Sequence, residues 1–131
     1  MVGLSNRGWS SLGAAAYGLQ RLVWTGKLPM EIREMRAQPD GFELVFTKPV
    51  AASSVRDPAA FHLASHTYLY QSKYGSDEIE HHPVSIHRCE VSADGLRVRL
   101  RTEAMRPFFV HCLVAAGVRS TDGEPLLHPE A

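Results

Sequence analysis

The sequence has no net charge, few cysteines, no long apolar run and no catalytic motif. Its 14 basic and 14 acidic residues cancel, so nothing indicates a nucleic-acid partner. The apolar runs are too short to cross a bilayer, and no membrane insertion is expected. Two cysteines, Cys89 and Cys112, cannot make a disulfide framework. Free buried thiols are the expectation, with one bridge between strands as the alternative.

The first residues lack a basic segment followed by an apolar one, so no signal peptide is predicted in this segment. A length of 131 residues suits one domain. Residues 1–28 hold half of the glycines and are interpreted as a lead-in or linker, partly packed on a domain formed by residues 29–131. Residues 17–24 suit a strand or a short helix, and Trp24 is expected to plug one end of the core.

The clearest early strand is predicted at residues 42–46, where Phe42, Leu44 and Phe46 alternate with Glu43 and Val45. A turn at residues 39–41 precedes it, which favours a hairpin with a strand at residues 31–37 over a helix there. Asp57 before Pro58 fits the N-cap of a short helical turn.

The second half of the chain shows further strands separated by turns. A strand is predicted from residue 61 to about residue 70, followed by a long polar loop at residues 71–83. Residues 84–91 form a strand if a β-bulge lies near Arg88.

Two more strands complete the pattern. Leu96, Val98 and Leu100 are expected to face inward, opposite an outward row of arginines (Arg97, Arg99 and Arg101) that forms a solvated face or protects a sheet edge. Residues 108–115 are nearly all apolar, which favours a central strand buried on both sides. His111, within that run, is expected to be a satisfied core histidine.

The pattern as a whole predicts an all-β fold. About seven short strands, turns every ten residues or so and one short helical turn are typical of an antiparallel β-sandwich of the Ig-like or fibronectin type III-like kind.

Several segments carry a resemblance to the Ig-like modules of bacterial surface-layer and secreted proteins. The resemblance covers roughly residues 29–127. It rests on the strand at 42–46 with Lys48-Pro49-Val50, and on residues 57–63, 92–100 and 118–126. It implies a scaffold with no invariant catalytic residues.

A second resemblance rests on residues 17–27, 34–36, 68–70, 74–76 and 123–131. These are similar to a segment of large secreted proteins of planctomycetes and their relatives, where it follows a sugar-dehydrogenase-like β-propeller and often accompanies a haem-binding domain. The resemblance implies that a propeller is a neighbouring domain. This chain has no Cys-x-x-Cys-His motif, so no haem or other cofactor is expected, and the oxidoreductase activity of those proteins does not transfer.

Histidines and carboxylates are the groups of this sequence that could carry chemistry. His81 and His82 with His87 could gather a divalent metal, but no partner lies at a matching spacing, so solvated loop histidines and no metal site are expected. Asp77, Glu78 and Glu80 lack the pattern of a calcium loop and are expected to be exposed loop charges.

The candidate surface is the aromatic group that leads into the long loop. Tyr68 and Tyr70 are expected to share a strand face. Such residues could dock a neighbouring domain or stack on sugar rings. The candidate residues for this surface are His66, Tyr68, Tyr70, Tyr74, Asp77 and Glu78.

These observations lead to one functional expectation and one alternative. The chain is expected to be a non-catalytic accessory module, not an enzyme, that acts as a spacer or docking domain in a larger exported protein. Its partners would be neighbouring domains of the parent chain, and its location periplasmic or extracellular. The alternative is a small module that binds carbohydrate or another ligand through residues 68–80.

Overall fold

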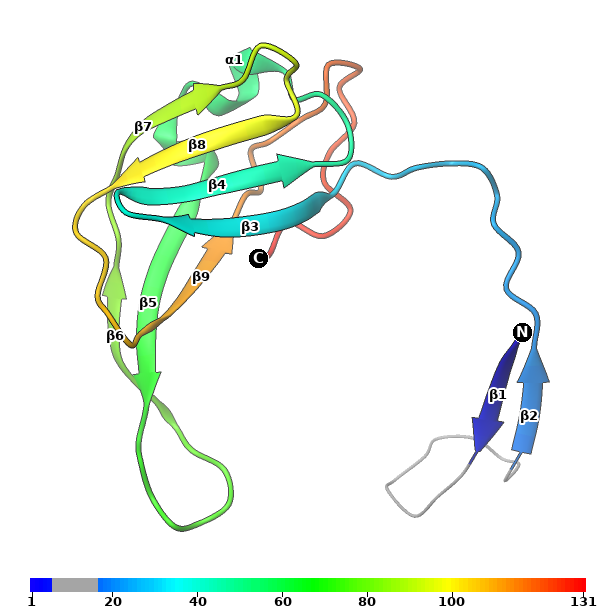
Figure 1. Cartoon of the computed structure of the whole chain (residues 1–131), viewed down its shortest axis with the longest axis horizontal. Coiled ribbons are helices and arrows are strands. Elements are labelled where there is room, and N and C mark those ends of the chain that lie inside the picture. Colours follow the sequence, from blue (N-terminus) through cyan, green and yellow to red (C-terminus); the bar gives the residue numbers. More distant parts are fainter. Residues whose placement is uncertain (6–16) are drawn as a thin grey trace.

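The strands of this chain form antiparallel sheets in a computed structural model that describes residues 1–5 and 17–131 (Figure 1). One sheet has four strands, in the order β3 (Ile32–Gln38), β4 (Gly41–Phe46), β8 (Arg97–Thr102) and β7 (Ile86–Val91). A second has three, in the order β6 (Glu78–Pro83), β5 (His62–Tyr68) and β9 (Val110–Val114). The two sheets share one core, so the predicted all-β sandwich is confirmed.

The core is built from alternating side chains of both sheets. Leu44 on β4 and Leu100 on β8 are fully buried, as is Leu113 on β9 of the other sheet. Phe46 and Leu63 belong to the same cluster. Burying each such side chain stabilises the fold by about 1.5–3 kcal/mol. The predicted inward residues Phe42, Leu44, Phe46, Val98 and Leu100 therefore supply much of the core. Leu96, also predicted to face inward, is only partly buried, and Val45, predicted on the polar side, is 5% exposed.

Two short helical elements follow β4. α1 spans Ala52–Val55, and a 3-10 helix spans Pro58–Ala60. The Asp57 carboxylate accepts a hydrogen bond from the backbone N–H of Ala59 at 2.9 Å. The predicted N-cap is confirmed, because this bond satisfies a donor that has no partner within the helix.

The β3–β4 hairpin is confirmed, and its turn depends on Gly41. Gln38 pairs with Gly41 across the hairpin. Gly41 has φ +142°, and a Cβ placed on it would lie 2.0 Å from the Leu100 carbonyl oxygen. Only glycine fits there, because the backbone conformation and the closeness of β8 both exclude a side chain.

The arginine row on β8 is not at a sheet edge, because β8 lies between β4 and β7. Arg99 and Arg101 both donate to the Asp40 carboxylate, and Arg101 Nε lies 3.3 Å from Glu90 Oε2. The idea of edge protection is wrong. The row instead forms ion pairs with the β3–β4 turn and with β7.

Two predictions about strands also need correction. Among the described strands only β5 pairs with β9, and the other side of β9 is bonded to the C-terminal tail: Leu113 and Ala131 exchange backbone hydrogen bonds, and Val114 forms a bridge with Glu130. Within β9 only Leu113 is buried, so the prediction of a strand buried on both sides is wrong. Residues 78–83, predicted as loop, form β6. Their side chains are mostly exposed polar groups, which leaves no apolar alternation from which a strand could be predicted. The bulge predicted near Arg88 is confirmed by a register shift between Ile86 and Arg88.

The N-terminal segment forms a separate hairpin. β1 (Val2–Ser5) pairs with β2 (Tyr17–Gln20), and an extended stretch leads from β2 to the sandwich (Figure 1). Trp24 in that stretch is 70% exposed, so the prediction that it plugs the core is wrong. Within the described residues, no helix is long and apolar enough to cross a membrane.

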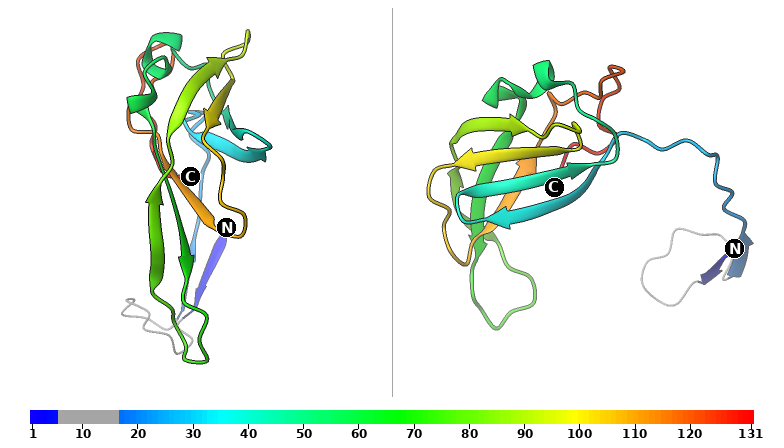
Figure 2. Two further views of the ribbon diagram at one scale, coloured as in Figure 1. Left: turned by 90° about the vertical axis from the view of Figure 1, so that its left-hand side faces the viewer. Right: turned by 45° about the horizontal axis from the view of Figure 1, so that its top comes forward.

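Strands β5 and β6 extend beyond the edge of the four-stranded sheet, with residues 69–77 at their tip (Figure 1; Figure 2). The Ser76 hydroxyl donates to the Leu69 carbonyl at 2.5 Å, and the Leu69 N–H donates to the Asp77 carbonyl at 3.2 Å. These bonds close the loop at its base. The protruding β5–β6 hairpin carries the candidate surface residues named in the sequence analysis.

Replacing Gly41 by alanine should destabilise the fold by about 3 kcal/mol or more, because it adds both backbone strain and a clash with Leu100. Gly123→Ala is the matched control. Gly123 also has a positive φ, +82°, but a Cβ there would meet nothing within 4 Å, so only about 1 kcal/mol is expected. Urea unfolding of the two variants checks this, and equal losses of stability would contradict it.

Candidate functional site

The six predicted surface residues all lie on the protruding β5–β6 hairpin. His66 and Tyr68 are on β5, Glu78 is the first residue of β6, and the others lie in the loop between them. Tyr70 and Tyr74 are essentially fully exposed, at 103% and 98%. The fold therefore brings His66, Tyr68 and Glu78 together, while Tyr70 and Tyr74 project into solvent. Tyr70 lies beyond the end of β5, so Tyr68 and Tyr70 do not share a strand face.

A β-bulge in β6 determines which side chains meet. Ser65 pairs with His82 and Thr67 pairs with Ile79, so His66 faces two residues, Glu80 and His81. Glu80 has φ +56°, a left-handed conformation. A bulge adds one residue to one strand and turns its side chains relative to the partner strand. His81 is thereby placed beside His66.

Arg106 binds Glu80, the other of the two bulge residues opposite His66. Its guanidinium donates to the Glu80 carbonyl at 2.8 Å and to Glu80 Oε2 at 3.0 Å. The same group lies 3.4 Å from the centroid of the Phe109 ring. These contacts stabilise the left-handed backbone of Glu80, because charge-assisted hydrogen bonds are about twice as strong as neutral ones. Glu80 thus serves the backbone and not the histidine cluster.

His66 is the buried member of the cluster. It is 5% exposed, and its ring packs edge-on against Tyr68 with centroids 5.2 Å apart. Among the described residues its Nε2 atom is buried and has no hydrogen-bond partner. Leaving a buried polar atom unpaired costs about 1–3 kcal/mol. An imidazole nitrogen held in this way is available to a ligand.

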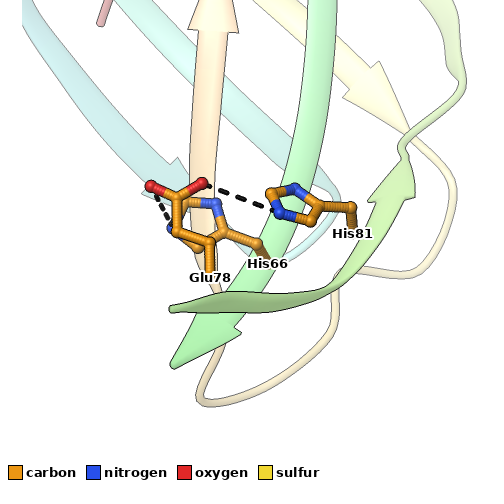
Figure 3. Close-up of side chains that lie close together, drawn as sticks. All are labelled: His66, Glu78 and His81. Carbon is orange, nitrogen blue, oxygen red and sulfur yellow. Dashed lines mark ion pairs between the residues drawn. The ribbon is translucent and has the colours of Figure 1, made fainter. Parts of the chain in front are cut away.

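Glu78 lies between two imidazoles (Figure 3). Its Oε1 is 3.7 Å from His66 Nε2, and its Oε2 is 3.7 Å from His81 Nε2. The two rings lie 5.4 Å apart between centroids. Glu78 and His81 have half-exposed side chains, at 50% and 59%. The cluster is therefore buried at His66 and open to solvent on the other side.

Sequence reasoning selected His81 but grouped it with the wrong residues. His82 follows His81 along a strand and points to the opposite face, where its Nε2 lies 3.6 Å from Glu103 Oε1. The sequence pattern groups His66 with the tyrosines only. A strand at residues 78–83, paired with β5, would have predicted that Glu78 lies beside His66. The extra residue of the bulge has no signature in the sequence.

His111 fits its prediction in part. The ring is half-buried and packs against Phe42 with centroids 5.6 Å apart, and Nδ1 lies 3.1 Å from the Phe109 carbonyl. Its Nε2, however, is buried and has no hydrogen-bond partner among the described residues. It belongs to the core side of the sheet, since it pairs with Ser65 and not with His66.

The two cysteines are free, and they differ in environment. Cys112 is exposed on β9, so the prediction that both thiols are buried is wrong for Cys112. Cys89 is partly buried. Burial raises the pKa of the Cys89 thiol, and the nearby Asp57 carboxylate raises that pKa further.

Comparison with known proteins supports the fold. No family model matches the chain, and no curated protein matches it. Solved structures of surface-layer protein SbsC do match, at 19% identity over 79% of this chain. The structure of its domains 1–6 and the crystal structure of the S-layer protein rSbsC each give a TM-score of 0.59, and the N-terminal part of SbsC gives 0.58.

This chain spans only 13% of the length of the first two structures and 22% of the third. At this identity the likeness establishes the fold alone. The resemblance to surface-layer-type Ig-like modules is therefore confirmed as a fold.

We expect the two thiols to react with maleimide at different rates in the native protein without reductant. Cys112 should react first, because thiolate is the reactive form and Cys89 is partly buried with a raised pKa. Mass spectrometry after timed labelling follows the two phases. Cys112→Ser should remove the fast phase only. If no thiol titrates even in denaturant, the cysteines are bonded and the assignment is wrong.

Proposed function

We propose that this chain is a non-catalytic structural module of a larger exported protein, in which it docks against a neighbouring domain. The observation that carries the proposal is the fold match: the sandwich corresponds to a small part of a much longer surface-layer protein. A domain of that kind acts through its surface and its position in the chain. The second predicted role, that of a passive spacer, differs because it needs no contact with a neighbour.

The distribution of exposed apolar side chains supports docking over spacing. The stretch between β2 and the sandwich exposes Leu22, Val23 and Trp24, each by two thirds or more of its area, and Leu28 by half. Exposed aromatic and aliphatic side chains that lie together are typical of interaction surfaces. The projecting tyrosines Tyr70 and Tyr74 form a second such region at the tip of the β5–β6 hairpin.

The identity of the neighbour rests on the resemblance alone. On the resemblance of its segments to secreted proteins that carry a β-propeller, a propeller is the proposed neighbour, and the proposed location is the periplasm or the outside of the cell. Both are proposals of the same rank as docking itself. Sequencing of the whole gene tests both, because each requires a longer parent chain; a gene that encodes no propeller would contradict the first.

Docking can be tested by hydroxyl-radical footprinting of the isolated chain and of the longer parent protein that the proposal requires. Trp24, Tyr70 and Tyr74 are fully or largely exposed here, so they should be oxidised rapidly in the isolated chain. Docking predicts that Trp24, or the two tyrosines, become protected by at least about fivefold in the parent, since an interface excludes water from its centre. Phe46, which is buried in the core of the isolated chain, is the internal control. Equal oxidation in the two proteins would contradict docking.

The alternative, carbohydrate binding, is supported by the exposure of the tyrosines, because aromatic rings can stack on sugar faces. It predicts that a glycan raises the melting temperature of the isolated chain by mass action. A thermal-shift screen of oligosaccharides checks this. Tyr70→Ala should abolish the shift, whereas Phe108→Ala, at another fully exposed aromatic residue, should not. No shift with any glycan would count against this alternative and leave the docking proposal intact.

A further inference from the structure

We propose that His66, Glu78 and His81 form a binding site for a first-row divalent metal ion, with zinc as its best representative. The site is independent of the docking proposal, because it rests on three side chains of the β5–β6 hairpin. One ligand atom of each residue lies within 4.8 Å of the other two. Two imidazoles and one carboxylate make up a common set of three protein ligands, which leaves a fourth position for water or another donor.

The distances are close to those that a metal requires. Ligand atoms about 2.0–2.1 Å from a tetrahedral zinc ion lie about 3.3 Å from one another. In this cluster Glu78 Oε1 is 3.7 Å from His66 Nε2, and Oε2 is 3.7 Å from His81 Nε2. Both distances are too long for a hydrogen bond, so the three groups face one another without binding one another. Small rotations of the side chains would bring them to coordination distance.

The cluster combines one fixed ligand with two adjustable ones. His66 is 5% exposed and is held against Tyr68, so its orientation is set by the fold. Its Nε2 atom is buried, directed toward Glu78, and has no hydrogen-bond partner among the described residues (Figure 3). Glu78 and His81 are half exposed and free to rotate toward a bound ion. A metal ion would satisfy the buried nitrogen that the protein leaves unpaired.

The donor atoms select the class of metal. Imidazole nitrogen suits zinc, copper, nickel and iron, whereas magnesium and calcium prefer sites made of oxygen ligands only. A metal that joins His66 on β5 to Glu78 and His81 on β6 would also hold the two strands together at the bulge. Zinc should therefore stabilise the protruding hairpin, in addition to binding it.

The chain contains its own matched control. His81 and His82 are neighbours on β6, have similar side-chain exposure (59% and 55%), and each lies close to a glutamate. They point to opposite faces of the strand, and only His81 belongs to the cluster. His81→Ala and His82→Ala therefore remove the same surface group from the same segment, and they differ only in the proposed site.

The experiment is a calorimetric titration of the metal-free full chain with zinc chloride, repeated with magnesium and calcium. We expect one zinc ion per chain and no heat from the other two metals. His81→Ala and Glu78→Gln should each weaken zinc binding by about tenfold or more, whereas His82→Ala should leave it unchanged. The zinc-dependent rise in melting temperature should follow the same pattern, because a ligand that binds only the native state stabilises it.

Nitrogen NMR of the imidazoles supplies the direct evidence. Addition of zinc should shift the Nε2 resonances of His66 and His81 and leave that of His82 in place. The variants change exposed residues, so a failure to fold is not expected to hide the result. Absence of zinc binding, equal weakening by His81→Ala and His82→Ala, or an unshifted His66 resonance would each overturn the proposal. Equal weakening would identify adventitious binding by surface histidines.

Discussion

The close approach of Gly41 to the backbone of Leu100 is the constraint on which the sandwich depends. A Cβ at this position would lie 2.0 Å from the Leu100 carbonyl oxygen, so the β3–β4 turn and β8 can meet only at glycine. The contact fixes the register of β3, β4 and β8. Register matters because a slip of one residue would exchange the inward and outward faces of a strand. Leu44, Val98 and Leu100 would then leave the core.

The second sheet covers the core beside the four-stranded sheet, and it carries the candidate site. β5 and β9 cover the core with Leu63 and Leu113, and β6 extends the sheet on the other side of β5. Since β6 contributes few apolar side chains, it tolerates an extra residue at Glu80 and His81. That bulge turns His81 toward His66. The cluster of His66, Glu78 and His81 thus arises because β6, an edge strand whose register few apolar side chains define, pairs with β5, whose register the core defines.

Strand pairing also gives two groups of charged side chains partners that their sequence positions do not indicate. The sequence predicts a solvated row for the arginines of β8, but Arg99 and Arg101 share the Asp40 carboxylate of the β3–β4 turn. In the sequence, Asp77, Glu78 and Glu80 form one group of charges that is predicted to lie exposed in a loop. In the sheet, Glu78 faces two histidines while Glu80 pairs with Arg106. Alternation along a strand places sequence neighbours on opposite faces of the sheet, and pairing between strands brings together residues that are far apart in the sequence.

The fold class and most of the four-stranded sheet can be predicted from the sequence. Period-two alternation at residues 42–46 and 96–100, together with the turns beside them, is local information, because each pattern needs only the chain around it. The Asp57 cap and the bulge near Arg88 were predictable for the same reason. The pairing of β9 with the C-terminal tail, the strand β6 and the meeting of His66, Glu78 and His81 depend on the tertiary structure. Each depends on which strand lies alongside which, and strand neighbours are selected by burial of the whole core and not by the residues of one segment.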